Sequence, residues 1–145
     1  LPDLKYALPG PAKRYSGAED YFERASAAIL EMYRQTGPCV LEDGRLKRGV
    51  VIRHLQLPGE LENTRRCIDW VAETFRPGEV LFSLMSQYTP LPQVENISPL
   101  NRKTTKREYE RLLDYTFSLG VTNAFLQEGP VAEESFIPEF DGRGI

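Results

Sequence analysis

The hydrophobic and polar positions follow two different periods in alternating stretches of the chain. Apolar runs, rich in β-branched residues where the signal is strongest, predict strands at about residues 2–6, 49–57, 80–86 and 122–127. Between these runs, apolar residues recur at helical spacing and predict helices near 17–35, 61–75 and 105–119. Strands that alternate with helices in this way are typical of parallel βαβ units, whose helices cover the sheet. The pattern therefore predicts an α/β fold with a parallel sheet.

Two of the predicted helices begin at a capping-box sequence. Ser16 stands three residues before Glu19, and Thr105 stands three residues before Glu108. In this spacing the hydroxyl caps the backbone N–H of the glutamate, and the glutamate side chain reaches back to the cap residue. We therefore expect helices to start directly after Ser16 and Thr105.

The connections between the predicted elements differ in character. Residues 38–48 form a charged stretch with a turn signal at Asp43-Gly44, compatible with a small hairpin. Residues 88–103 contain three prolines and show neither period, so they predict a long irregular loop.

Composition narrows the class of protein. With 145 residues, 41% of them hydrophobic, the chain predicts one globular domain over residues 1–145. Its net charge is −3 and charges of both signs are interspersed, which gives no electrostatic footprint for nucleic acid or an anionic membrane. Apolar runs are too short to span a membrane. Two cysteines without metal-ligand spacing favour a reduced, cytoplasmic protein.

Polar residues gather where the predicted strands end, which in parallel α/β folds is the side that carries chemistry. Asp3 and Lys5 share one face of the first strand because strand side chains alternate, and Arg53 has the inward phase on the next strand. A lysine and an arginine on neighbouring strand ends predict a pocket for a small anion such as a carboxylate or phosphate. A purely structural cluster of ion pairs is an equally open interpretation.

The other reactive side chains favour structural roles. His54, the only histidine of the chain, alternates out of phase with Arg53 and therefore faces the helical layer, where we expect a hydrogen-bonded core histidine. Cys39 lies in a predicted loop and Cys67 on a predicted helix, and neither is expected to be catalytic.

Three segments in this order carry a resemblance to a known family. DLKY ends the first predicted strand, IRHLQLPG lies at the end of the second, and SLMSQYTP lies at the end of the third. This order resembles the C-terminal half of radical S-adenosylmethionine enzymes, in particular those similar to the activating enzyme of pyruvate formate-lyase, over residues 3 to about 141. The resemblance implies a partial (half) TIM-like (β/α) barrel of the radical S-adenosylmethionine type, with this chain as its C-terminal portion.

The resemblance also implies roles for individual residues. Lys5 would contact the methionine carboxylate of S-adenosylmethionine, and Arg53 would contact the same bound cofactor. Asp3 matches a possible ligand of a monovalent cation. Gln87 stands where the family often places a histidine near the ribose and adenine.

One family motif is missing from the chain. The family holds a 4Fe–4S cluster through a CxxxCxxC loop, which this sequence lacks. The family uses the cluster to cleave S-adenosylmethionine to a 5′-deoxyadenosyl radical, acting on a partner such as a glycyl-radical enzyme. We therefore expect the parent protein to be a radical S-adenosylmethionine oxidoreductase. We expect the chain by itself to be inactive and to hold neither cofactor. We also expect it either to self-associate through an exposed barrel edge or to be the ordered part of a longer chain.

Two other interpretations remain open. A lysine-dependent (β/α) barrel enzyme of the decarboxylase or aldolase type carries DxKxxD on a strand, but Leu8 stands at the position of the final aspartate. A non-catalytic module that oligomerises through open sheet edges would need no site at all.

Overall fold

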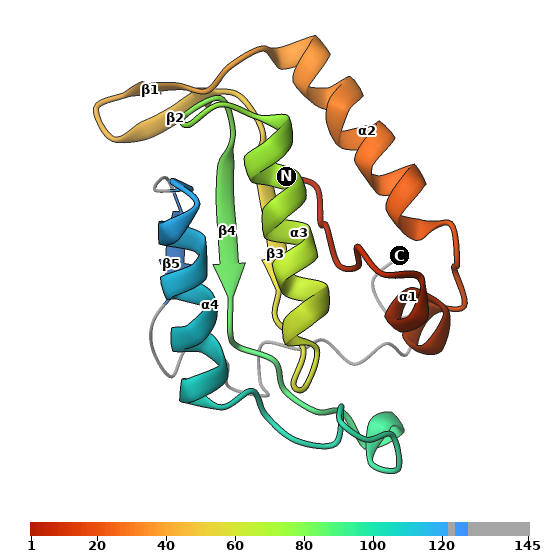
Figure 1. Ribbon diagram of the computed structural model, residues 1–145. Helices are drawn as coiled ribbons and strands as arrows, with labels where there is room; N and C mark the ends of the chain where they lie inside the picture. Colours follow the sequence, from red (N-terminus) through yellow and green to blue (C-terminus); the bar gives the residue numbers. More distant parts are fainter. Residues whose placement is uncertain (122–123, 128–145) are drawn as a thin grey trace, which may run out of the picture.

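The computed structural model of the chain describes residues 1–121 and 124–127 and contains a parallel sheet. The strands β3 (Val51–Leu55), β4 (Leu81–Met85) and β5 (Ala124–Gln127) lie side by side in that order (Figure 1). The helices α3 (Leu61–Thr74) and α4 (Lys106–Ser118) connect successive strands. Both neighbouring pairs are parallel, which confirms the predicted α/β class and strand direction.

The predicted first strand is reduced to a short extended segment beside β3. Asp3 forms an isolated parallel bridge with Arg53. The Leu4 N–H donates to the Arg53 carbonyl, and the Arg53 N–H donates to the Pro2 carbonyl, each at 2.9 Å. The segment therefore continues the parallel sheet by one row, although its ladder is too short to count as a strand.

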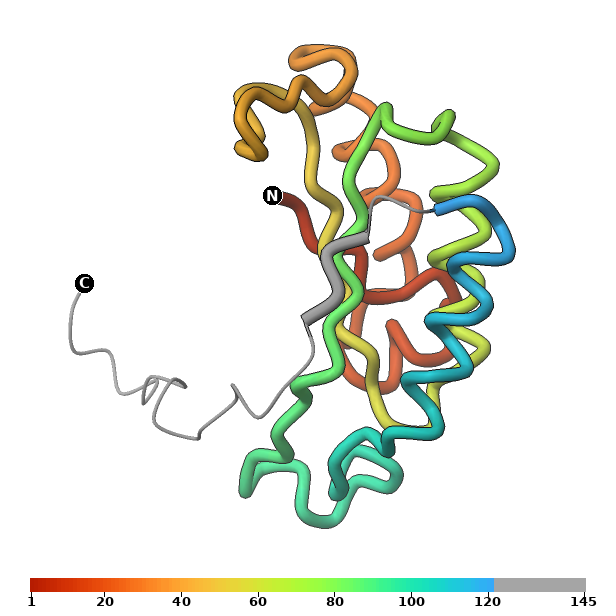
Figure 2. The backbone as a smooth tube through the Cα atoms, turned by 90° about the vertical axis from the view of Figure 1, so that its left-hand side faces the viewer, coloured from red at the N-terminus to blue at the C-terminus, as the bar shows by residue number. Residues whose placement is uncertain are grey.

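The helices α2 (Tyr21–Thr36), α3 and α4 all lie on one side of the sheet, as Figure 2 shows. The core lies between this helical layer and the sheet. It contains aliphatic and aromatic side chains from the strands and from all three helices: Leu4, Ile29, Ile52, Ile68, Phe82, Leu84 and Leu112. This burial explains the helical stripes in the sequence, because each stripe is the face that meets the sheet.

The predicted helix at 17–35 is wrong at its start. The structure has a separate helix α1 (Pro9–Ser16), which Gly17 ends in the left-handed conformation (φ 66°). Helix α2 begins four residues later, and the Ser16 hydroxyl donates to the Tyr6 hydroxyl rather than capping a helix. Proline in the first turn and glycine after the last are the signals of α1. A capping-box spacing that spans this glycine misled the prediction.

The other local predictions are confirmed. Strands β1 (Val40–Glu42) and β2 (Arg45–Arg48) form an antiparallel hairpin around Asp43 and Gly44, which both have positive φ. Thr105 and Glu108 form a complete capping box at the start of α4. The loop before α4 contains only the short 3₁₀ helix η1 (Pro92–Val94). The half barrel is not confirmed, because the described residues form an open sheet and no barrel.

Candidate functional site

The candidate site lies on the face of the sheet that α2, α3 and α4 leave uncovered, which we call the helix-free face (Figure 2). Strand alternation places on it the side chains in phase with Arg53, and the register sets Asp3 and Ser83 beside Arg53. Toward the amino ends of the strands solvent does not reach this face, since Val51 and Leu81 are buried. Toward the carboxyl ends, Arg53 is exposed and Ser83 is half-buried, so solvent reaches this part of the face.

Asp3 and Arg53 form an ion pair on this face. The Nε and Nη2 atoms of Arg53 both lie 2.7 Å from the same oxygen, Oδ1 of Asp3. The side chains are 44% and 35% exposed, so water screens the pair and its contribution to stability is small. In this side-on geometry no other contact is recorded within the described residues for Nη1, which leaves the end of the guanidinium available to a second anion.

The outer edge of the segment that carries Asp3 and Lys5 is covered by one phenol. The Tyr21 hydroxyl donates to the carbonyl of Asp3 at 2.8 Å and accepts the N–H of Lys5 at 3.0 Å. These are the backbone groups that an additional strand would pair. Burial is the main cause that raises the pKa of Tyr21 above its usual value. Tyr21 therefore stands in for a neighbouring strand and fixes the backbone on both sides of Leu4.

A buried amide holds the same segment where it leaves the sheet. Asn63 of α3 donates through Nδ2 to the Lys5 carbonyl at 3.0 Å. Its Oδ1 accepts the N–H groups of Ala7 at 2.9 Å and Leu8 at 3.2 Å. The backbone of Lys5 is thus tied on one side to Tyr21 and on the other to Asn63. The exposed side chain of Lys5 therefore extends from backbone that these hydrogen bonds hold in place.

The structure brings two of the four predicted site residues into contact. Asp3 and Arg53 are in contact, and Lys5 follows them in the same phase on the helix-free face. Gln87 lies two residues beyond the end of β4 and is half-buried, and no contact with Lys5 or Arg53 is recorded for it. The convergence of all four residues remains a prediction.

Three residues around the site were missed by the sequence reasoning. Ser83 is the direct neighbour of Arg53 in the sheet, and only the register between the two strands reveals it. Tyr21 and Asn63 act through tertiary contacts with backbone groups 18 and 58 residues away in the chain. A tyrosine and an asparagine on helical faces carry no local signal for such a role.

His54 occupies the predicted structural position on the opposite side of β3. It is buried, with Nδ1 2.6 Å from the Leu4 carbonyl and Nε2 2.9 Å from the Thr64 hydroxyl. Because a carbonyl can only accept, Nδ1 carries the proton and Nε2 accepts from Thr64. Burial lowers the pKa of His54 to about 4. The histidine is thus a neutral link between the sheet and α3, as predicted, and not a ligand of the site.

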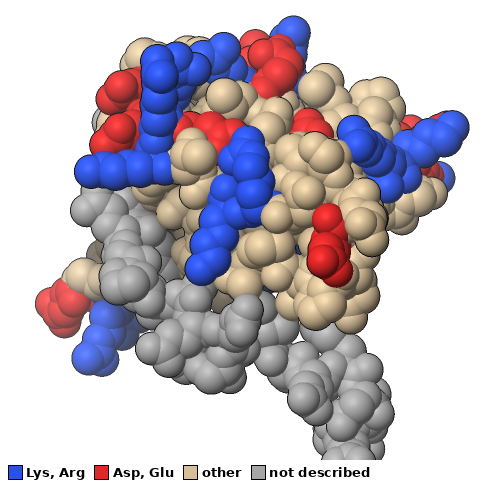
Figure 3. Space-filling model, turned by 90° about the horizontal axis from the view of Figure 1, so that it is seen from below, with Lys and Arg blue, Asp and Glu red and all other residues tan. Residues whose placement is uncertain are grey.

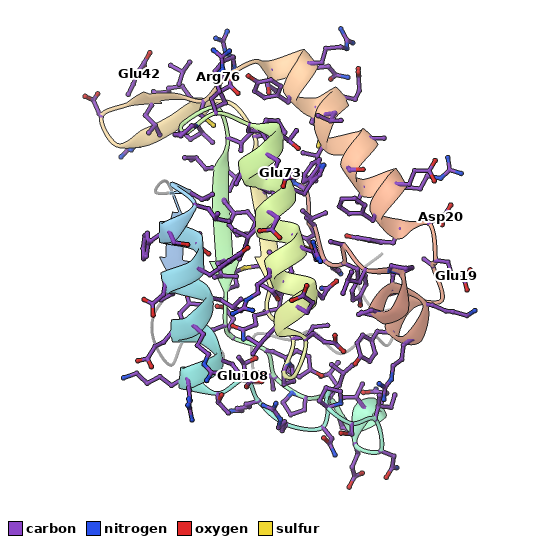
Figure 4. The ribbon with its side chains drawn as sticks, in the orientation of Figure 1. Glu19, Asp20, Glu42, Glu73, Arg76 and Glu108 are labelled. Atoms are coloured by element: carbon purple, nitrogen blue, oxygen red, sulfur yellow. The ribbon has the colours of Figure 1, made fainter. Side chains whose placement is uncertain are left out.

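Glu108 ties the loop after β3 to the start of α4. Its side chain lies at the start of α4 (Figure 4). The carboxylate accepts the backbone N–H of Gly59 and Thr105 at 2.9 Å each, and Arg102 binds both oxygens at 2.8 Å. The hydrogen bond from Arg102 is the main cause that holds the pKa of Glu108 well below its usual range. This junction orders the carboxyl end of the sheet.

Among the described residues, Gln56 is the one whose buried side-chain polar atoms lack hydrogen-bond partners. It follows β3, is fully buried, and neither its Oε1 nor its Nε2 has a hydrogen bond within the part of the chain that is described. Its backbone is paired, since its N–H donates to the Met85 carbonyl at 2.9 Å. A buried amide without partners costs stability.

The described residues do not fit an iron–sulfur cluster. Over residues 1–121 and 124–127, no group of three His, Cys, Asp or Glu side chains is placed to hold a metal. Cys67 is buried in the core, and this burial raises the pKa of its thiol, whereas a cluster ligand must be a thiolate. Cys39 lies against the Val50 carbonyl, 3.6 Å away.

The surface charges at the carboxyl ends of the strands and the hydropathy of the described helices assign no further role to the site. Seen from the side where the strands end, basic and acidic side chains are interspersed over the surface (Figure 3). Among the described helices, none is both long and apolar enough to cross a membrane.

In comparisons with known proteins, no family model, no curated protein and no solved structure matches the chain.

Proposed function

We propose that the chain is the carboxylate-binding part of a radical S-adenosylmethionine enzyme that resembles the activating enzymes of glycyl-radical enzymes. The observation that carries the proposal is the Asp3–Arg53 pair on the solvent-accessible half of the helix-free face. With Lys5 in the same phase, the three side chains have a net charge of +1, which matches one carboxylate. In a (β/α) barrel the helix-free face would be the inner wall.

Arg53 would be the principal contact of the methionine carboxylate. A guanidinium can donate two parallel hydrogen bonds to a carboxylate. Asp3 occupies the Nε side, so the end formed by Nη1 and Nη2 is the side that a ligand would meet. Lys5 would add a second, more flexible donor from the neighbouring row of the sheet.

The register of the sheet supports this arrangement. Ser83 stands beside Arg53 on β4, where its hydroxyl can donate to or accept from a ligand bound at the arginine. Gln87 follows the same strand and would meet the ribose or adenine part, through hydrogen bonds that do not depend on pH. These contacts bind and orient S-adenosylmethionine.

The cluster belongs to a different segment in this proposal. Since the described residues offer no set of thiolates, we derive no chemical step through a cluster and assign no catalytic residue to this chain. The parent protein, a cytoplasmic oxidoreductase in this proposal, would bring a CxxxCxxC loop to the site and would act on a glycyl-radical enzyme or a similar partner.

The reading frame that encodes the chain tests the proposal. We expect a CxxxCxxC segment encoded upstream of Leu1 in the same frame. We also expect the full product, purified anaerobically with iron and sulfide, to show the absorption of a 4Fe–4S cluster and to bind S-adenosylmethionine. A frame without such a segment, or a full product that does not bind S-adenosylmethionine, contradicts the proposal.

A further inference from the structure

The Asp3–Arg53 contact allows two opposite roles for Asp3 in the proposed site. As a competitor, the Asp3 carboxylate would occupy the guanidinium that the ligand needs. As a positioning residue, it would hold the guanidinium in the orientation that the ligand needs. The sequence resemblance suggests a third role, as a cation ligand. The geometry of the pair distinguishes among them.

The contact uses only one side of the guanidinium. Nε and Nη2 of Arg53 converge on a single oxygen, Oδ1, at 2.7 Å each. Nε can reach an acceptor only from the side of the group, whereas a ligand carboxylate bound end-on uses Nη1 and the second hydrogen of Nη2. A ligand can therefore bind without displacing Asp3, which disfavours the role of competitor.

Asp3 is itself held more firmly than an exposed aspartate usually is. Its backbone carbonyl accepts from Tyr21, and the residues on both sides of it are hydrogen-bonded to Arg53 through the backbone. An arginine side chain has several rotatable bonds and loses considerable entropy when it is fixed. A fixed carboxylate that restrains Arg53 before binding removes part of that cost from the binding step.

The same geometry disfavours a cation at Oδ1 of Asp3. Oδ1 already accepts two hydrogen bonds from a positively charged group at 2.7 Å. A cation bound to that oxygen would lie close to the guanidinium, and like charges at such a distance repel each other.

We infer that Asp3 is a positioning residue of the carboxylate site, which restrains the guanidinium of Arg53 from its Nε side so that the opposite end receives a ligand carboxylate. This inference rests on the proposed function. Its electrostatic consequence is unusual. Removing a negative charge beside an anion site should strengthen anion binding by simple Coulomb attraction, whereas loss of positioning should weaken it.

The test compares the affinity for S-adenosylmethionine of the wild-type full-length protein and its variants by equilibrium dialysis. We expect Asp3→Ala to lower the affinity about tenfold, and Asp3→Glu, which keeps the carboxylate, to recover part of the loss. Glu42→Ala is the control for net charge, because Glu42 lies on the exposed hairpin, and it should change the affinity less than twofold. Unchanged circular dichroism and melting temperature establish that each variant is folded.

Other outcomes overturn the inference in identifiable ways. If Asp3→Ala binds equally or more tightly, Asp3 is a bystander or a competitor. If replacing sodium and potassium by tetramethylammonium at constant ionic strength weakens binding to the wild-type protein but not to Asp3→Ala, Asp3 is a cation ligand. If the wild-type protein does not bind at all, the proposed function itself fails, and the inference falls with it.

Discussion

The Nε2 atom of His54 lies 2.9 Å from the hydroxyl of Thr64, and this hydrogen bond joins β3 to α3 inside the core. The same hydroxyl also lies 3.3 Å from the carbonyl of Glu60. Neutral His54 accepts a hydrogen bond from the Thr64 hydroxyl at Nε2, whereas charged His54 would donate there and turn the hydroxyl hydrogen toward the Glu60 carbonyl. The contact therefore couples the packing of α3 to the protonation state of the only histidine.

We predict that the stability of the protein falls as the pH decreases from 6.5 toward 4. Burial lowers the pKa of His54 to about 4, whereas the unfolded chain has a value near 6.5. The unfolded state binds the proton first, so the stabilisation is complete above pH 6.5 and is lost as the pH falls toward 4. At about 1.4 kcal/mol per pKa unit, the loss between pH 7.5 and 5 is about 2 kcal/mol. Urea unfolding at several pH values measures it. In His54→Gln the dependence above pH 5 should disappear, and its persistence would place the cause elsewhere.

Substitution of Gly59 by alanine should destabilise the carboxyl end of the sheet. Gly59 has φ +77°, and a Cβ there would lie 2.8 Å from Cγ of Pro99. Both the backbone conformation and the steric contact oppose alanine, so we expect a loss of about 2–4 kcal/mol in the free energy of unfolding. Gly120→Ala is the matched control, since its φ is +74° but no atom of the described residues would lie within 4 Å of the added Cβ. Equal losses in the two variants would show that the contact with Pro99 contributes nothing.

Removal of the Glu108 carboxylate should cost more than removal of an ordinary surface carboxylate. Only 14% of its side chain is exposed, and it accepts hydrogen bonds from Gly59, Thr105 and Arg102. We expect Glu108→Ala to lower the free energy of unfolding by about 2 kcal/mol. Glu62→Ala breaks an exposed ion pair with Arg66 one turn along a helix and should cost at most about 0.5 kcal/mol. A loss at Glu108 no larger than at Glu62 contradicts the junction described above.

The buried amide of Gln56 gives a prediction of the opposite sign. Because neither polar atom has a partner in the described structure, Gln56→Leu should raise the free energy of unfolding by about 1–2 kcal/mol. Asn63→Leu is the control, since its amide makes three hydrogen bonds to the backbone and its replacement should be strongly destabilising. Destabilisation by Gln56→Leu would instead indicate that the amide binds a water molecule or a ligand.

The Tyr21 hydroxyl pairs with the outer edge of the segment that carries Asp3 and Lys5. This contact bears on the predicted self-association, which remains a prediction. Tyr21→Phe removes the hydroxyl that pairs with Asp3 and Lys5, and leaves two strand-edge groups available for pairing with another chain. We expect light scattering to give a higher average mass for this variant than for the wild-type chain, relative to the monomer mass of 16.5 kDa. Equal masses for the two proteins would show that this edge does not mediate association.

The sequence predicts the parts of this fold that depend on local patterns. The parallel strands β3 and β4, the helices α3 and α4 and the capping box at Thr105 follow from periodicity and spacing, and the phase of His54 against Arg53 follows from strand alternation. The start of α2 was missed because Gly17 ends one helix inside a spacing that also fits the start of another. The roles of Tyr21, Asn63 and Ser83 depend on which segments become neighbours, and a single sequence does not encode this locally.

The proposed contact between Arg53 and the carboxylate of S-adenosylmethionine can be tested by comparing two ligands. S-adenosylmethionine and its decarboxylated form differ only in the carboxylate, so their affinities for the full-length protein, measured by calorimetry in wild type and Arg53→Ala, form a cycle. We predict that Arg53→Ala weakens S-adenosylmethionine binding 10- to 100-fold, or about 1.4–2.8 kcal/mol, and leaves the decarboxylated ligand unchanged. Equal effects on both ligands, or no effect on either, would contradict the account.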